Sequence, residues 1–458
     1  MTGSSTLPPR PPFVLRARVL TPLGDGGTRY EPDGRLEVDP AGRIVSIGPW
    51  QAGGSAEAVE AADDEAPVLD LRPLILLPGM VDLHVHLPQL PNAGVGAGLD
   101  LLTWLGRYIF PLEREFDVAT AEVIAPAAFR AMAAAGTTTA MMYGAVFEPS
   151  LDAAFQAAET HGIRAIIGKV MMDRLTYDER LAPDRILETS LRQSADLCAR
   201  WHGRDDGRLQ YAFTPRFAVS CTADMLRESA AMARDTGAYW QTHLSEDVHE
   251  LREVARLFPD AVDYLDVYDR AGGLGARTVL AHAIHLSGRE VHRLAATDTA
   301  VAHCPASNLF LASGAMPLAR YRAAGIRVGL GSDVAAGPEL SIFANMRAGA
   351  YVMNGLRVLD GDAALPPLRP TDWLRMGTLE GARALGLADR IGSLERGKEA
   401  DLIAVDPRTV APIQGIDSDD PDEIVSRLAF RPHPSMVRAA WVRGRRLDGP
   451  PGLAPDQP

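Results

Sequence analysis

Eight apolar runs, separated by amphipathic stretches, constrain the fold of this chain more than any other feature of its sequence. The runs are LILLPGMVDLHVH, TTTAMMYGA, RAIIGKVMMD, LQYAFTPRF, YWQTHLSED, TVLAHAIH, TAVAHCP and RVGLGSDV. Between them lie stretches such as TAEVIAPAAFRAMAAAG and TADMLRESAAMARDTG, whose apolar residues recur at helical spacing. Eight βα units of this kind predict an α/β protein with a (β/α)8 TIM-type barrel rather than a doubly wound sheet.

The two ends of the chain carry a different pattern, of short alternating strands and turns. FVLRARVLTPL and RLEVDPAGRIVSIGP precede the barrel, and GSLERGKEADLIAVDP and MVRAAWVRGRRL follow it. We expect them to form one small β-sandwich domain built from both termini. The predicted division is a barrel at 76–388, a sandwich at 13–75 and 389–448, and flexible Pro/Gly-rich tails at 1–12 and 449–458.

Nearly every apolar run ends in side chains that can do chemistry. In barrel enzymes the active site lies at the C-terminal ends of the strands, so we expect these side chains to meet at one mouth. They are His84, His86, Arg216, His243, Glu246, His282, His303 and Asp333.

The sequence HVH predicts a metal site. Residues two apart on a strand face the same side, so His84 and His86 can both reach one ion, although buried histidines can also be satisfied by backbone carbonyls. His243, His282 and Asp333 end three other runs, and imidazoles with one carboxylate suit zinc with a position left open for water.

One metal ion is favoured over two. Two-metal barrels of this kind need a bridging anion, often a modified lysine at the end of the fourth strand. That place reads TPRF here, and Lys169 belongs to the third run, where we interpret it as structural.

Glu246 follows His243 by three residues in HLSED. It could serve as the N-terminal carboxylate of the following helix, which reads EDVHELREVARLF. Beside a metal ion, it could instead move a proton from water to a leaving nitrogen. We favour the proton carrier.

Composition and charge exclude several classes of partner. The chain is 47% hydrophobic and 23% charged, as in ordinary globular proteins, and its formal charge of −13 argues against nucleic acid. Its three cysteines contain no CxxC pair, which suits free thiols in a reducing compartment. Because no apolar run is long enough to cross a bilayer, we expect a cytoplasmic protein without a membrane partner.

Several of these segments resemble the amidohydrolase superfamily, in its mononuclear zinc deaminase branch. They are PGMVDLHVHLPQLPNAG, THLSE, LAHAIHLS, HCPASN and GLGSDV. Three more specific segments, HLPQLPNAGVGAGLDLLTWLGRYIFPLEREF, GKVMMD and TPRFAVSC, are similar to the members of that branch that deaminate guanine. The similarity runs from about residue 76 to 405.

This resemblance implies the hydrolytic deamination of guanine to xanthine and ammonia, in purine catabolism, by a homodimer. It implies one Zn²⁺ ion per subunit, with iron as the alternative, held by His84, His86, His243 and Asp333. It also implies that Glu246 shuttles a proton, that His282 orients the hydroxide and that Asp333 doubles as the general base.

The same resemblance assigns the purine to Gln89, Arg216 and Phe217. Guanine offers O6 and N7 as acceptors to a guanidinium, an amide can both donate and accept, and a phenyl face can stack. A surface ion pair for Arg216 and a core position for Phe217 are the structural alternatives. The resemblance implies further substrate contacts from His86, His243, Glu246 and Asp333.

Two departures and two other functions stay open. DVAAGPEL replaces a glycine-rich run that the family commonly has after Asp333, so the loop behind the substrate is expected to differ, and His303 receives no role. The chain could instead act on another aminated or chlorinated purine, pyrimidine or triazine. It could also be a non-catalytic scaffold, although no metal ligand is missing. A cytidine-deaminase site is excluded because the HxE and PCxxC signature is absent.

Overall fold

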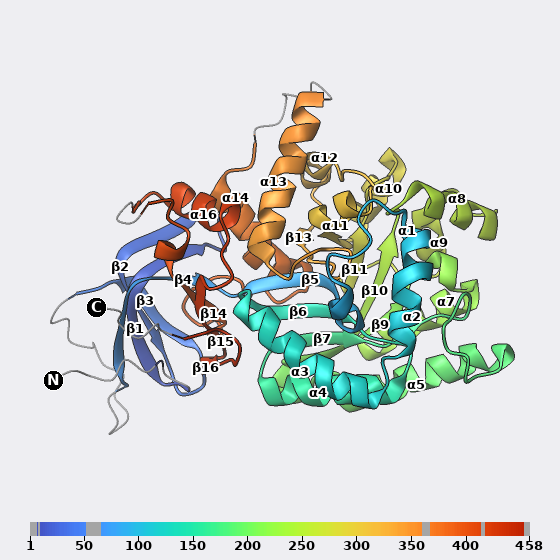
Figure 1. The fold of residues 1–458 in the computed structure, drawn as a ribbon, viewed down its shortest axis with the longest axis horizontal. Helices are drawn as coiled ribbons and strands as arrows, with labels where there is room; N and C mark the ends of the chain where they lie inside the picture. Colours follow the sequence, from blue (N-terminus) through green and yellow to red (C-terminus); the bar gives the residue numbers. More distant parts are fainter. Residues whose placement is uncertain (1–6, 8–9, 52–65, 360–366, 414–416, 453–458) are drawn as a thin grey trace.

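The computed structural model describes residues 7, 10–51, 66–359, 367–413 and 417–452. A barrel of parallel strands surrounded by helices forms its larger part, and a separate mixed sheet built from both termini lies beside it (Figure 1). The predicted fold class is therefore confirmed.

Each of the eight apolar runs contains one barrel strand. In hydrogen-bonded order the strands are β5 (Met80–His86), β6 (Thr137–Tyr143), β7 (Arg164–Gly168), β9 (Leu209–Pro215), β10 (Tyr239–Leu244), β11 (Thr278–His282), β12 (Ala300–His303) and β13 (Val328–Leu330). The short strand β8 (Val170–Met171) pairs only with β9. The barrel closes where the Asp333 amide donates to the His84 carbonyl at 2.7 Å and the His86 amide donates to the Val334 carbonyl at 3.0 Å.

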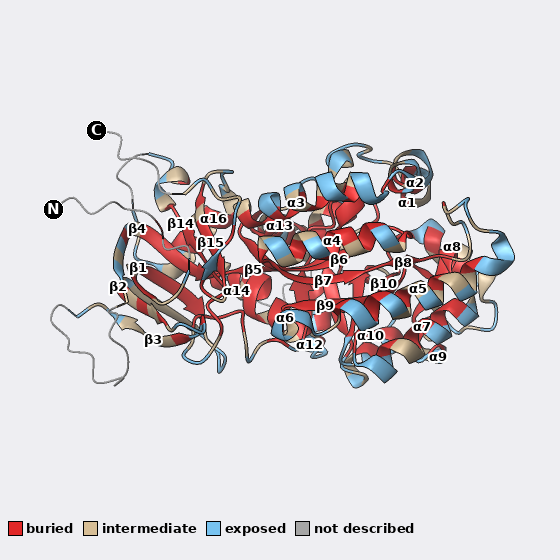
Figure 2. Cartoon of the chain, turned by 90° about the horizontal axis from the view of Figure 1, so that it is seen from below, coloured by how far each residue is buried: buried red, intermediate tan, exposed pale blue. Residues whose placement is uncertain are grey.

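All residues of these eight strands are buried. Helices cover the outside of the barrel and side chains fill its interior, so the strands read as continuous apolar runs without polar alternation. Figure 2 shows the strands buried and the exposed residues on the outward sides of the helices.

The main helices of the barrel surround its strands, and several begin at a side-chain cap; Asp117, for example, accepts from the Thr120 amide, and Thr222 accepts from the Met225 amide. These helices are α3 (Val118–Ala134), α4 (Glu148–His161), α5 (Ile186–Trp201), α7 (Ala223–Thr236), α8 (Val248–Leu257), α9 (Tyr264–Arg270), α10 (Gly288–Ala296), α11 (Pro305–Phe310), α12 (Leu318–Ala323), α13 (Ile342–Leu359), α14 (Pro370–Arg375) and α15 (Gly381–Ala384). In the described residues, no helix combines the length and hydropathy needed to cross a membrane.

The connection between β5 and α3 is long and contains several short helical segments. They are η1 (Leu87–Asn92), α1 (Leu101–Trp104), η2 (Leu105–Ile109) and α2 (Phe110–Arg114). This connection supplies apolar walls to the pocket described below.

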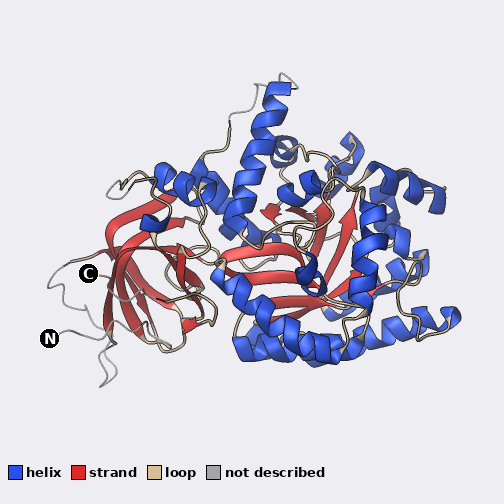
Figure 3. Ribbon diagram, viewed as in Figure 1, coloured by secondary structure: helices blue, strands red, loops and turns tan. Residues whose placement is uncertain are grey.

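The terminal sheet draws strands from both ends of the chain, blue and red in Figure 1, and Figure 3 shows it apart from the strands of the barrel. Its order is β16 (Arg445–Arg446), β15 (Val437–Val442), β14 (Leu402–Val405), β4 (Val68–Pro78), β1 (Phe13–Pro22), β2 (Thr28–Val38) and β3 (Ile44–Pro49). Strand β4 pairs with β1 and β14 and ends at Pro78, so residues 76–78 belong to this sheet. The helix α16 (Pro421–Phe430) packs against α13 and α14.

The tails predicted at 1–12 and 449–458 lie partly outside the described residues. Within the described part, Leu7 is buried in the apolar core of the terminal sheet, at 4% exposure.

A buried ion-pair network joins the terminal segment to the N-terminal end of the barrel. Arg164, at the start of β7, donates to Asp401 at 2.9 Å and also to Glu399. These side chains are 1%, 2% and 3% exposed, respectively. Arg443 donates to the same Glu399 carboxylate at 2.8 Å. The network therefore holds two carboxylates that would be costly to bury alone.

We expect Arg164→Met to lower the free energy of unfolding by about 3–5 kcal/mol, because Asp401 and Glu399 would lose a buried cation. Urea denaturation followed by tryptophan fluorescence measures this change. Arg293→Met is the control, since Arg293 pairs with Asp269 at a position where its side chain is 43% exposed, and its loss should cost less than about 1 kcal/mol. Equal losses for the two variants would show that the network does not stabilise the fold.

Candidate active site

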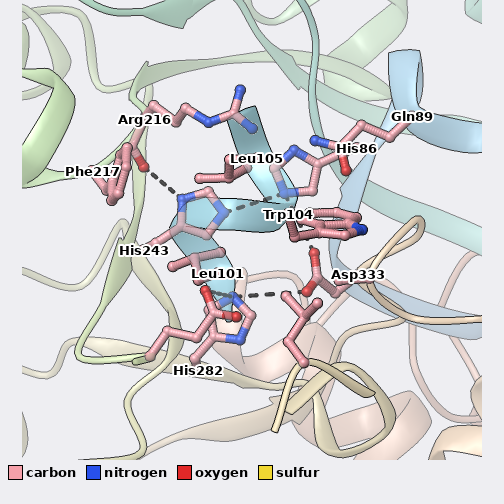
Figure 4. Close-up of a pocket in the computed structure, with 13 residues that line it drawn as sticks. His86, Gln89, Leu101, Trp104, Leu105, Arg216, Phe217, His243, His282 and Asp333 are labelled. Carbon is pink, nitrogen blue, oxygen red and sulfur yellow. Dashed lines mark hydrogen bonds and ion pairs between the residues drawn. The ribbon is translucent and has the colours of Figure 1, made fainter. Parts of the chain in front are cut away.

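A pocket lies at the C-terminal ends of the barrel strands (Figure 4). Strand ends supply most of its polar side chains, and the connection after β5 supplies Gln89, Leu101, Trp104 and Leu105. The predicted site residues that line it are His86, Gln89, Arg216, Phe217, His243, Glu246, His282 and Asp333. His84 lies directly beside them and is 1% exposed.

Four side chains bring ligand atoms together at one point. The Nε2 atom of His86 lies 3.3 Å from His84 Nε2 and 3.2 Å from His243 Nε2. The Oδ1 atom of Asp333 lies 3.2 Å from His84 Nε2 and 3.4 Å from His86 Nε2. Ligands about 2.1 Å from a tetrahedral ion lie about 3.4 Å from one another, so this set fits a metal ion.

Hydrogen bonds made by the Nδ1 atoms orient the imidazoles of His243 and His282. His243 Nδ1 lies 2.5 Å from the Arg216 carbonyl, which can only accept, so Nδ1 carries the proton and Nε2 presents its lone pair to the cluster. By the same reasoning, His282 Nδ1, 2.9 Å from the Asn308 Oδ1 atom, is protonated. His282 Nε2 has no hydrogen-bond partner among the described residues, and it lies 3.4 Å from Glu246 Oε2 and 3.8 Å from Asp333 Oδ2.

Burial keeps the imidazoles in the form that binds metal. It lowers the pKa of His86 to about 4, lowers that of His84, and lowers that of His243 well below its usual range. Neutral imidazole is the state that offers a lone pair to a cation.

The Glu246 carboxyl faces the pocket and does not cap a helix. The N-cap of α8 is Asp247, which accepts from the His249 and Glu250 amides. Burial raises the pKa of Glu246 well above its usual range, and the charge of Asp333 raises it further. A carboxyl with a raised pKa, 3.4 Å from His282 Nε2, can act as an acid.

Polar side chains behind the cluster hold its strands in place. Asp82 accepts from the Ser332 amide at 2.9 Å, from the Ser332 hydroxyl at 2.5 Å and from the His84 amide at 3.1 Å, and so joins β5 to the end of β13. Ser307 donates to Asp333 Oδ2 at 2.5 Å. The ring of Tyr143 packs against His84 at a centroid distance of 4.8 Å.

Comparison with known proteins agrees with this geometry. Residues 75–446 match the amidohydrolase family. The chain is 40% identical to a probable guanine deaminase of Deinococcus radiodurans over 381 residues, which cover 82% of this chain and 83% of that protein. It is 36% identical to the guanine deaminase of Escherichia coli over 408 residues, or 87% of each chain.

The chain belongs to the amidohydrolase family. Among solved structures it is similar to a guanine deaminase from C. acetobutylicum with guanine bound in the active site. The TM-score is 0.85 and the identity is 26%, and the match covers 95% of this chain and 99% of that one.

Arg216 forms a buried ion pair, in contrast to the surface ion pair that the sequence left as an alternative. Its side chain is 2% exposed, and Nη1 donates at 2.5 Å to Glu113, which is fully buried in α2. Glu113 also accepts from Gln89 Nε2 at 2.7 Å. Glu113 is not among the residues predicted from the sequence, although it lies in FPLE, within a segment that carries the family resemblance. Phe217 lines the pocket and is also part of the main apolar core.

Lys169 and His303 lie apart from the four candidate metal ligands. Lys169 donates to the Ser190 hydroxyl at 2.9 Å, and burial lowers its pKa to about 7. His303 is 1% exposed, and burial lowers its pKa to about 3. It is absent from the pocket lining and from the groups of potential ligands within the described residues.

The loop that departs from the family pattern reaches the pocket. Ala336 lines it, and the Ala335 amide donates to Gln89 Oε1 at 3.4 Å. DVAAGPEL therefore contributes to the surroundings of Gln89.

We expect His243→Ala to lose most of its bound metal, because one of four ligand atoms is removed, whereas His303→Ala should keep it. Mass spectrometry of the purified proteins for metals measures the content per chain, with about one ion expected in the unchanged protein. His303 serves as the matched control, since it is also a buried histidine and ends β12, which is separated from β10 by β11. Metal loss from both variants would contradict the assignment of ligands.

Proposed function

We propose that the protein is a guanine deaminase, which converts guanine and water to xanthine and ammonia. One observation carries the proposal: a four-donor metal cluster shares a buried pocket with the guanidinium of Arg216 and the amide of Gln89. In Figure 4 these two side chains lie on the side of the pocket opposite His282. The guanine deaminases to which the chain is similar support the same reaction.

Zinc is the proposed metal, with one ion per subunit and iron as the alternative. Three imidazole nitrogens and one carboxylate oxygen suit zinc and leave room for water. When bound, the ion supplies Lewis acidity, which lowers the pKa of water towards neutrality. The ligands would be His84, His86, His243 and Asp333. Four distances between their ligand atoms, each 3.2–3.4 Å, support this assignment.

Three side chains would move or hold protons during the reaction. Asp333 Oδ2, 3.8 Å from His282 Nε2, takes the proton of the attacking water as general base, while His282 orients that water. Glu246, whose pKa is raised by burial, gives its proton to the ring nitrogen beside C2, then takes the proton of the added hydroxyl and passes it to the leaving amine. The proton held by Asp333 afterwards returns to Glu246. The C2–N bond breaks, ammonia leaves, and the oxygen of water stays on C2.

The purine would lie between the four metal ligands on one side and the side chains of Arg216 and Gln89 on the other. Arg216 and Gln89 would donate to acceptors of the ring, and Phe217 would contact its face. Leu101, Trp104 and Leu105 cover the pocket with apolar surface, which favours a flat, largely uncharged base. His86, His243, Glu246 and Asp333 would contact the reacting end of the ring.

A cytoplasmic homodimer that acts in purine catabolism completes the proposal. The three cysteines are free and buried, which suits a reducing compartment. The dimer rests on the family resemblance, and analytical ultracentrifugation tests it.

We expect ammonia release to be fastest with guanine in a panel that also contains adenine, cytosine and ammeline. A coupled ammonia assay gives kcat/KM for each base. Treatment with a chelator should abolish turnover, and added zinc should restore it. Much faster release from ammeline or another heterocycle would favour a related aminohydrolase, and the absence of both metal and turnover in folded protein would favour a scaffold.

We expect Glu246→Gln to keep its zinc while kcat falls about 10²–10⁴-fold, because a proton carrier is lost and no ligand is touched. Metal analysis and steady-state kinetics on guanine measure the two quantities. Glu253→Gln is the control, because Glu253 lies on α8 and only pairs with exposed Arg256. Zinc loss in the Glu246 variant would instead make Glu246 part of the metal site.

A further inference from the structure

Glu113 lies behind Gln89 and Arg216, the two polar residues proposed to bind the purine, and contacts both. It is 0% exposed, and each of its carboxylate oxygens accepts from a different side chain. Oε1 accepts from Gln89 Nε2 at 2.7 Å, and Oε2 accepts from Arg216 Nη1 at 2.5 Å. Glu113 itself is absent from the pocket lining, so it acts through these two residues.

The contact with Glu113 determines which way the Gln89 amide faces. A carboxylate oxygen can only accept a hydrogen bond, so the nitrogen end of the amide must point towards Glu113. The oxygen end accepts from the Ala335 amide at 3.4 Å. The nitrogen end has one further N–H to donate, and the oxygen end, held at the Ala335 amide, keeps one lone pair.

Arg216 is held in the same way. Its Nη1 atom is committed to Glu113, and its guanidinium carbon lies 5.2 Å from the centre of the Phe110 ring. A guanidinium has no acceptor, so every group that it still offers to the pocket is a donor. The nitrogen end of Gln89 and the guanidinium of Arg216, which both contact Glu113, therefore present donors.

We infer that Glu113 is a positioning residue that orients these donors and so selects purines with an oxygen at C6 over purines with an amino group there. The inference rests on the proposed function and deepens it. Guanine keeps its C6 oxygen through the reaction, and that oxygen accepts from both donors. An amino group at C6 would place N–H groups against N–H groups, and a site built to hydrogen-bond one partner rejects the mismatched one strongly.

A purely structural ion pair between Glu113 and Arg216 makes a different prediction. Loss of packing alone would lower activity towards all purines by a similar factor. The ratio of activities on two purines that differ at C6, and with it in whether N1 carries a proton, therefore separates the two roles. Guanine and 2,6-diaminopurine form such a pair, because both carry the amine that leaves from C2.

In Glu113→Gln the new amide can donate as well as accept, so Gln89 is free to turn its oxygen towards the pocket. We expect the ratio of kcat/KM for guanine to kcat/KM for 2,6-diaminopurine to fall by at least about 10-fold, mainly through KM for guanine, with zinc content unchanged. Glu113→Asp, which keeps the carboxylate, should keep most of the preference. Glu290→Gln is the control, because Glu290 is also buried but caps α10.

An unchanged ratio in Glu113→Gln, or loss of zinc from it, overturns the inference while the proposed function stands. A wild-type protein that releases no ammonia from guanine overturns the proposed function itself, before any variant is compared. If Glu113→Gln does not fold, the inference is tested on the wild-type protein instead. Its turnover of guanine is measured in the presence of two purines that lack the C2 amine and compete for the site. Hypoxanthine, with oxygen at C6, should then inhibit at least about 10-fold more strongly than adenine, and equal inhibition overturns the inference.

Discussion

The backbone hydrogen bonds that join β5 to the segment after β13 close the barrel. The grouping of the four candidate metal ligands depends on these bonds. The Asp333 amide donates to the His84 carbonyl, and the His86 amide donates to the Val334 carbonyl. These bonds bring a carboxylate from the last strand within 3.2 Å of an imidazole from the first. Asp82 reinforces the same junction by accepting from Ser332.

The charged side chains buried around the pocket lie beside groups that compensate their charge. Arg216 pairs with Glu113, Asp333 lies among imidazoles, and burial raises the pKa of Glu246. This arrangement limits the cost of desolvation and leaves the donors and acceptors oriented before a substrate arrives, which is how a dry site stabilises charge that develops during a reaction.

The two ends of the barrel have different tasks. At the C-terminal ends of the strands lie the metal cluster and the pocket. At the N-terminal end, Arg164 joins the barrel to Asp401 and Glu399 of the terminal segment. Stability and chemistry are therefore separated along the strand direction, as in other barrels of this type.

The periodicity of the sequence by itself determined the barrel and the pairing of His84 with His86, because burial on both faces of a parallel strand and the two-residue repeat are local properties. The tertiary structure alone decided that Asp247 rather than Glu246 caps α8. It also decided that Glu113 contacts Gln89 and Arg216, since these residues come from η1, α2 and the end of β9. Sequence spacing carries no information on such a contact, which exists only once the barrel has closed and the connection after β5 has packed over its mouth.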